Sequence, residues 1–248
     1  MLIKLLLKNA TLLLMGGIMI ANAAAKAESL RTPEGNMPMV HWAVLESTPG
    51  DMQTMSGIAA KTVGPQAAKE SGTYALYGGV DASNQDKMRL LEIYESYEAY
   101  RIHSSSEAFQ EYRAARLPYL KSLKILEVNG IALEQKKEGV GSVVLMRRYE
   151  VDPRRLLEFQ HLAKAEAIRA VREEDGILGM FVTAEHDAPN IIHTMEIYRD
   201  KASYDEYAAS QENLTFQKNT EPMFLNVHVV ENAPTRITLS DKGLRSDE

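Results

Sequence analysis

The chain has 248 residues, of which 45% are hydrophobic and 25% charged, a composition typical of a globular protein that can bury a core. Its net charge of −6 and the absence of a basic stripe argue against nucleic acid as a partner. The chain has no cysteine, which excludes disulfides, thiolate metal ligands, a cysteine nucleophile and a lipid-modified N-terminal cysteine.

The first 25 residues have the three parts of a secretory signal peptide in their usual order. Lys4 and Lys8 provide a basic start, residues 11–20 (TLLLMGGIMI) form an apolar segment, and small side chains follow, with cleavage expected after Ala23 or Ala25. The pattern predicts export to the periplasm or secretion. An uncleaved membrane anchor is the alternative, because the apolar segment with its flanks is nearly long enough to span a bilayer. We expect no membrane span in the mature chain.

After this segment, the elements follow the order β-α-β-β-α-β. Thr48-Pro49 marks the start of the first helix, since proline favours the first helical position. Aromatic and aliphatic runs separated by polar turns indicate the strands. In chain order, the sequence predicts a strand at 37–46, a helix over 50–69, strands at 72–80 and 87–95, a helix over 96–115 and a strand at 122–133.

A second series of elements repeats this order, and a shift of 104 residues superimposes it on the first without a gap. The Glu-Ile-Tyr motif at 92–94 falls on the same motif at 196–198, and Pro118 falls on Pro222. The second series consists of a strand at 142–151, a helix that Asp152 caps, strands at 176–185 and 191–199, a helix from Lys201 and a strand at 224–231.

Two copies indicate two similar domains, because an array of small repeated units needs at least three copies to bury a continuous core. The order of elements in each copy is that of the ferredoxin-like split βαβ fold. The sequence therefore predicts a signal peptide at 1–25, a first domain at 37–133, a linker over 134–140, a second domain at 140–232 and a polar tail at 233–248.

Both faces of the central strands carry large apolar groups, which bears on how the two copies pack. In the strand at 87–95, Leu90 and Tyr94 lie on one face, and Leu91 and Ile93 lie on the other. The helices of one copy can cover only one face of its sheet, so the other face needs a second sheet. The predicted fold class is α+β, with two ferredoxin-like β-α-β-β-α-β domains packed sheet to sheet as an intramolecular dimeric α/β barrel. A homodimer of such pseudo-dimers is compatible with the pattern.

Three segments of the first copy resemble the antibiotic biosynthesis monooxygenase family, including its quinol monooxygenase-like members. Residues 70–74 (ESGTY) resemble the family's E-x-G-x-x strand opening, residues 92–94 (EIY) its E-x-W strand, and residues 103–109 (HSSSEAF) its H-x-x-S-x-x-F helix. The resemblance covers most of the first copy and, more faintly, the second. It implies a dimeric α/β barrel that oxidises a quinol or related phenolic molecule with O₂ and uses no metal, flavin or haem cofactor.

The resemblance also implies roles for individual residues. The substrate is deprotonated to an electron-rich anion, and His103 suits the proton acceptor because an imidazole titrates near neutral pH. Tyr94, Trp42, Tyr74 and Phe109 are the candidate substrate contacts, since aromatic rings stack on flat ligands. Core packing is the alternative for each of these side chains.

The second copy departs from the family pattern at the two helix positions of the motif. It has Tyr207 and Asn213 where the first copy has His103 and Phe109, and Tyr94 in the first copy stands where the family has tryptophan. A phenol with its ordinary pKa near 10 is a poor proton acceptor at neutral pH. Any catalysis is therefore expected in the first domain.

Other functions and other residues stay open from the sequence. Glu92 recurs as Glu196 within apolar strands, which favours structural pairing over catalysis. The remaining histidines lack the spacing of metal ligands, so we expect no metal site. One alternative function is a non-catalytic protein of the same fold that binds a small hydrophobic ligand. The other is a haem-binding or haem-degrading relative, against which the tyrosine at position 94 argues.

Overall fold

The computed structural model describes residues 38–136 and 141–241, so the predicted signal peptide lies outside the described residues. The first half consists of β1 (Met39–Ser47), α1 (Met52–Lys61), α2 (Val63–Ala67), β2 (Thr73–Asp81), β3 (Asn84–Tyr94), α3 (Tyr97–Ser105), α4 (Glu107–Arg116) and β4 (Leu120–Gln135), with a 3-10 turn at Leu117–Tyr119. The second half consists of β5 (Val143–Val151), α5 (Leu156–Glu173), β6 (Ile177–Glu185), β7 (Ile191–Tyr198), α6 (Lys201–Ala209), α7 (Gln211–Thr220) and β8 (Phe224–Asp241), with 3-10 turns at Pro153–Arg155 and Glu221–Met223.

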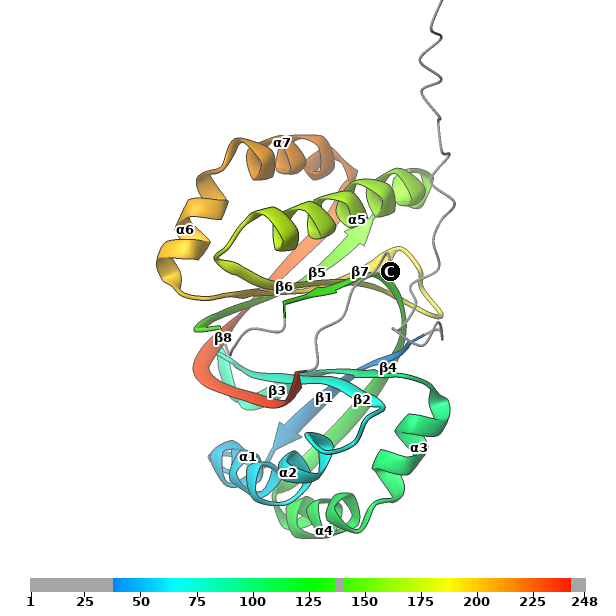
Figure 1. The fold of residues 1–248 in the computed structure, drawn as a ribbon, viewed down its shortest axis with the longest axis vertical. Coiled ribbons are helices and arrows are strands. Elements are labelled where there is room, and N and C mark those ends of the chain that lie inside the picture. The colour runs from blue at the N-terminus through cyan, green and yellow to red at the C-terminus, as the bar shows by residue number, and fades with distance from the viewer. Residues whose placement is uncertain (1–37, 137–140, 242–248) are drawn as a thin grey trace, which may run out of the picture.

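The eight strands of the described part form one closed barrel in the order β1-β3-β2-β8-β5-β7-β6-β4. Each half contributes a four-stranded antiparallel sheet, and the β2–β8 and β4–β6 pairs join the two sheets edge to edge. Figure 1 shows α1 to α4 on one side of the barrel and α5 to α7 on the opposite side. The prediction of two ferredoxin-like halves in one intramolecular α/β barrel is confirmed.

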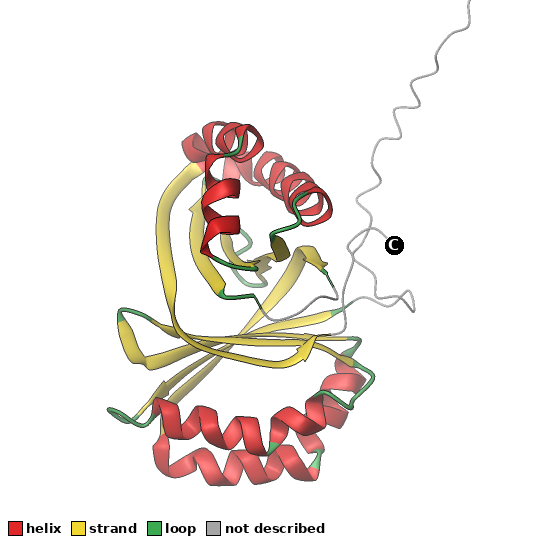
Figure 2. Ribbon diagram, turned by 60° about the vertical axis from the view of Figure 1, so that its left-hand side comes forward, coloured by secondary structure: helices red, strands yellow, loops and turns green. Residues whose placement is uncertain are grey.

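The barrel interior explains why both faces of the central strands are apolar. Leu91 and Ile93 of β3 pack in one buried cluster with Met195 and Ile197 of β7. The opposite faces of the same strands point outward to the helices that cover each sheet (Figure 2). One copy alone would therefore expose its inner face to water, and the second copy buries it.

Each predicted helix of the first half is divided into two, for local chemical reasons. Thr62 separates α1 from α2, and Pro65 follows in the first turn of α2, where its missing N–H disrupts continuation of the preceding helix. Ser106 separates α3 from α4 and caps α4, because its side chain accepts a hydrogen bond from the Phe109 N–H. In the second half, Ser210 caps α7 in the same way.

Gly72 and Gly176 occupy equivalent positions just before β2 and β6, where the chain passes very close to a helix. A Cβ at Gly72 would lie 2.6 Å from the Cβ of Ala99, and a Cβ at Gly176 would lie 2.3 Å from the Cβ of Ser203. Both distances are far shorter than a normal carbon–carbon contact. Each glycine therefore lets the following helix dock against the sheet, which positions the helices that line the cavities described below.

Two predicted boundaries are wrong because strands of one half continue to pair with the other. Residues 233–241, expected in a polar tail, belong to β8 and pair with β2. Glu134 and Gln135, expected in the linker, belong to β4 and pair with β6. Backbone pairing with a distant strand satisfies N–H and C=O groups whatever the local side-chain pattern. Across the described residues, the helices are too short or too polar to cross a membrane.

Candidate functional site

Each half contains a cavity between the outer face of its sheet and its helices. The first cavity has a volume of about 210 Å³, and the second has a volume of about 370 Å³. A cavity of ~150 Å³ can hold a benzene molecule, so both can accommodate a small aromatic compound. The first cavity is lined by apolar side chains together with a small set of polar ones: Glu92, Tyr100, His103, Tyr112, Arg113 and Arg116.

His103 lies in the last turn of α3, is only 2% exposed, and lines the first cavity. Its Nδ1 is 2.6 Å from Oε2 of Glu70, which also accepts a hydrogen bond from the Thr73 hydroxyl at 2.8 Å. A neutral imidazole donates its Nδ1 proton to such a carboxylate, so Nε2 carries the lone pair. Nε2 is therefore the nitrogen that can accept a proton from a ligand. The Phe109 ring, which also lines the cavity, packs edge-on against His103 with 5.2 Å between ring centroids.

Glu92 lies on the sheet side of the same cavity, on β3. The Tyr94 hydroxyl donates a hydrogen bond to its Oε2 at 2.9 Å. Burial raises the pKa of Glu92 to about 7, although the hydrogen bond from Tyr94 and the positive charge of Arg116 both act in the opposite direction. A carboxyl group with a pKa near neutral can accept or release a proton at physiological pH. The repeat in the sequence favours a structural role for Glu92, and only the fold places it on a cavity wall.

Arg116, at the end of α4, brings a buried positive charge to the first cavity. The side chain is 7% exposed, and its Nη1 donates to the Tyr112 hydroxyl at 3.3 Å. Its Nε is buried without a hydrogen-bond partner among the described residues. An arginine stays protonated, so this cavity can stabilise an anion. A basic residue in the last turn of a helix is common for other reasons, so the sequence carried no specific signal for this role.

The other candidate substrate contacts from the sequence, Tyr94, Trp42 and Tyr74, lie at different distances from the first cavity. Tyr94 is buried behind His103, with 5.5 Å between the ring centroids, and burial raises its pKa well above the ordinary tyrosine value. Trp42 and Tyr74 lie in the barrel interior, on the opposite face of the sheet from the first cavity. The Trp42 indole N–H donates to the Thr183 hydroxyl of the other half at 3.0 Å. The structure thus brings His103 and Phe109 together on the cavity wall, places Tyr94 directly behind them, and keeps Trp42 and Tyr74 in the core between the halves.

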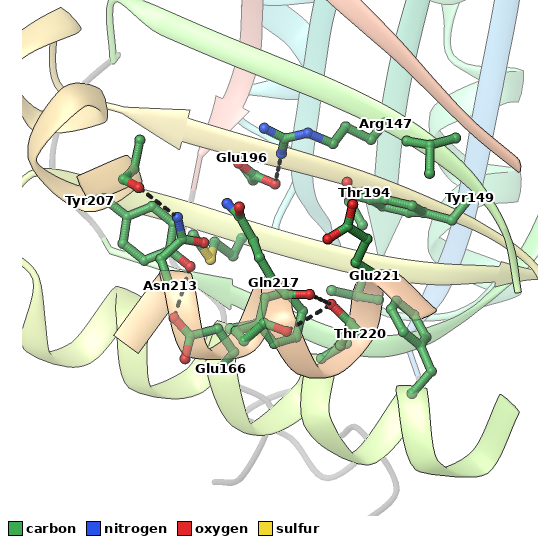
Figure 3. A pocket seen from close by; sticks show the side chains of 18 of the residues that line it. Arg147, Tyr149, Glu166, Thr194, Glu196, Tyr207, Asn213, Gln217, Thr220 and Glu221 are labelled. Atoms are coloured by element: carbon green, nitrogen blue, oxygen red, sulfur yellow. Dashed lines mark hydrogen bonds and ion pairs between the residues drawn. The ribbon is translucent and has the colours of Figure 1, made fainter. Parts of the chain in front are cut away.

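The second cavity occupies the equivalent place in the second half, with different polar groups. Tyr207 lines it where His103 lines the first cavity, and its hydroxyl donates to Oε1 of Glu166 at 2.8 Å. Burial raises the pKa of Tyr207 far above the ordinary tyrosine value, so this residue stays protonated. Glu196, the counterpart of Glu92, forms an ion pair with Arg147 (Figure 3). The second cavity therefore has a phenol where the first has an imidazole, and its sheet carboxylate is paired with a guanidinium.

The sequence profile of the antibiotic biosynthesis monooxygenase family matches the chain twice, over residues 39–115 and 142–219. These two matches cover more than half of the protein. The chain belongs to the antibiotic biosynthesis monooxygenase family. Membership, in tandem duplication, supports a monooxygenase function in general, and with it a small-molecule substrate. No curated protein matches the chain.

Solved structures share the complete double-domain fold of this family member. A candidate monooxygenase from Lactobacillus acidophilus has a TM-score of 0.75 at 18% identity, and the match covers 84% of this chain and 97% of the other. A candidate monooxygenase from Fusobacterium nucleatum has a TM-score of 0.72 at 16% identity, with 84% and 95% covered. An anthrone oxidase-like protein has a TM-score of 0.51 at 10% identity, with 83% and 94% covered. At these identities, the likeness shows the fold alone.

The titratable groups of this monooxygenase-family protein are not arranged as metal ligands in the part that the structure describes. Among those residues, no three His, Cys, Asp or Glu side chains are grouped to hold a metal ion. The polar groups of the first cavity are instead arranged as proton acceptors on two sides, His103 and Glu92, with a cation beside them.

Proposed function

We propose that the protein oxidises a quinol or a related phenolic molecule with O₂ in the first cavity, and that it needs no resident cofactor. One observation carries the proposal: a buried imidazole held by a carboxylate, a carboxyl group with a pKa near neutral and a buried guanidinium all line one small, mostly apolar cavity. A phenol that enters this cavity meets both a proton acceptor and a cation that stabilises the anion formed.

Proton transfer from the phenolic hydroxyl to Nε2 of His103 is the first step of the proposal. The imidazolium that forms is stabilised by Glu70, which already accepts a hydrogen bond at Nδ1. Arg116 stabilises the phenolate, because the attraction between opposite charges is strong where water is excluded. Preorganised charges of this kind lower the barrier without rearrangement during the reaction.

Oxygen then reacts with the electron-rich substrate anion. The substrate supplies four electrons, and O₂ is reduced: one oxygen atom forms a new carbon–oxygen bond on the ring and the other leaves as water. For a quinol, the overall reaction is quinol plus O₂ giving hydroxyquinone plus water, which balances in atoms and electrons. Glu92, on the opposite wall, can take the proton of the second hydroxyl group.

Oxygen uptake with a soluble quinol such as menadiol tests the proposal. Loss of a general base typically lowers a rate by ~10²–10⁴-fold, so we expect His103→Ala to reduce enzyme-dependent O₂ uptake by about that factor. Tyr207→Phe is the matched control at the equivalent position of the second half, and it should change the rate little.

The same assay separates the alternatives. Menadiol binding without enzyme-dependent O₂ uptake would indicate a non-catalytic ligand-binding protein. A Soret band that appears on titration with haem, and is lost in His103→Ala, would indicate a haem-binding relative. Full activity in His103→Ala would remove the proton-acceptor role of this residue.

A further inference from the structure

The second cavity is the larger of the two and has the lining of a small-molecule site. Its volume of about 370 Å³ falls in the range of ~300–1,000 Å³ that is usual for ligand pockets. Tyr149 and Phe224 stack at 4.6 Å between centroids on its wall, and Phe159 packs edge-on against Phe224 at 5.5 Å. Rigid aromatic walls of this kind suit a flat, mostly apolar ligand.

Arg147 places a hydrogen-bond donor on the sheet side of this cavity. It lies on β5, at the position that Ala43 occupies in the first half. Its Nη1 donates to Oε1 of Glu196. A guanidinium carries five N–H donors, so most of them stay available. The Arg147 side chain is 21% exposed, which is consistent with N–H groups that face the open cavity.

Two of the carboxylates that line this cavity, those of Glu196 and Glu166, are already engaged as acceptors, whereas Glu221 lines it from the exposed start of the turn Glu221–Met223. Both oxygens of Glu196 accept hydrogen bonds, one from Arg147 and the other from the Tyr198 hydroxyl at 2.7 Å. Glu166 accepts from the Tyr207 hydroxyl and forms two hydrogen bonds with Arg169 outside the cavity. On the helix side, the Gln217 amide points toward the Arg147–Glu196 pair, and the Asn213 amide donates to the Ala208 carbonyl at 3.2 Å (Figure 3). On the sheet side, the guanidinium of Arg147 is therefore the positively charged donor, and the hydroxyl of Thr194 is buried without a hydrogen-bond partner among the described residues.

We infer that the second cavity is a binding site for a small aromatic molecule whose polar group is a hydrogen-bond acceptor, such as a quinone carbonyl or an aromatic carboxylate. The two cavities then differ in the groups they offer a ligand. The first combines the proton acceptors His103 and Glu92 with the guanidinium of Arg116, and the second offers the guanidinium of Arg147 without a neighbouring imidazole. The inference concerns binding and does not depend on catalysis in the first cavity.

Isothermal titration calorimetry with three probes of similar ring size tests this inference without any turnover. Menadione carries neutral carbonyl acceptors, 2-naphthoate carries a charged acceptor, and 2-methylnaphthalene carries none. We expect at least one of the two acceptor probes to bind, and 2-methylnaphthalene to bind at least tenfold more weakly. Preference for menadione would indicate a neutral carbonyl ligand, and preference for 2-naphthoate a carboxylate ligand.

Variants assign the binding to the second cavity. Removal of Arg147 alone would leave Glu196 without its partner, so we choose Arg147→Met combined with Glu196→Gln, and Glu196→Gln alone as the matched control that keeps the guanidinium. Charge-assisted hydrogen bonds justify an expected loss of about tenfold to a hundredfold in the double variant. Glu196→Gln should retain the wild-type affinity or exceed it.

Two further results decide the inference. Arg116→Met, in the first cavity, should leave the affinity of the acceptor probe that binds unchanged. Equal affinity in the wild type and the Arg147→Met, Glu196→Gln variant would overturn the inference. The inference also fails if no acceptor probe binds the wild type, or if Arg116→Met abolishes the binding.

Discussion

Glu92→Gln tests how the carboxyl group on the sheet wall of the first cavity affects stability. Burial raises its pKa from 4.5 to about 7, so the folded state favours the protonated form more than the unfolded state does. A shift of this size corresponds to about 3 kcal/mol, at roughly 1.4 kcal/mol per pKa unit. Glu92 is only part-buried because it borders the cavity, and water there screens its charge. We therefore expect an effect of about 1–3 kcal/mol.

The direction of the pH dependence follows from the raised pKa. The stabilisation that Glu92 contributes is fully present below pH 4.5, the pKa of its carboxyl group in the unfolded chain. It is lost as the pH rises through about 7, the pKa of the group in the folded protein. Urea denaturation of the wild type and of Glu92→Gln, at intervals from pH 4.5 to 8, measures the effect as the difference between the two proteins. The wild type should lose about 1–3 kcal/mol of unfolding free energy relative to the variant over this range.

Glu196→Gln provides the control for this prediction. Glu196 is paired with Arg147, so its replacement leaves a charged group without its partner and should destabilise the protein across the whole pH range. If the difference between the wild type and Glu92→Gln were constant from pH 4.5 to 8, Glu92 would not titrate in this window. That result would refute both the raised pKa and its use as a second proton acceptor.

Three further predictions concern the assembly of the chain and its export. Trp42→Phe removes the indole N–H that donates to the Thr183 hydroxyl across the barrel. In urea denaturation, this variant should have an unfolding free energy about 1–3 kcal/mol lower than that of the wild type. An unchanged urea midpoint of unfolding would argue against this hydrogen bond. Residues 37–133 expressed alone lack β8 and β6, the strands that pair with β2 and β4 in the full chain. Light scattering of this fragment should therefore show a homodimer or aggregates, because unpaired edge strands associate. A stable monomer would contradict the pseudo-dimer argument. The N-terminal pattern predicts export and cleavage of the signal peptide. N-terminal sequencing of the protein from an exporting host should therefore begin near Ala24 or Lys26. A retained Met1 in the soluble fraction would count against cleavage.

The resemblance to the family's H-x-x-S-x-x-F helix is what made His103 and Phe109 candidate site residues. Ser106 begins a new helix between them, yet the two rings still meet, because the motif spacing spans one short break. Trp42 and Tyr74 were candidate contacts with core packing as the alternative, since an aromatic side chain suits a ligand wall and a core equally well, and the structure places both in a core cluster. The face of the sheet to which each strand residue points separates the two roles, and that depends on which face the helices cover.

The sequence by itself determined the order of elements, the duplication and the need to bury a second sheet face. The order of elements and the two apolar sheet faces follow from local propensity and strand alternation within single segments, and the duplication follows from comparing one half of the sequence with the other. Only the tertiary structure decided where β4 and β8 end, because their last residues pair with strands of the other half. It also decided the polar groups of the two cavities. Glu92 and Arg116 are 24 positions apart and Arg147 and Glu196 are 49 apart, so only the packing of helix on sheet and strand on strand brings each pair together.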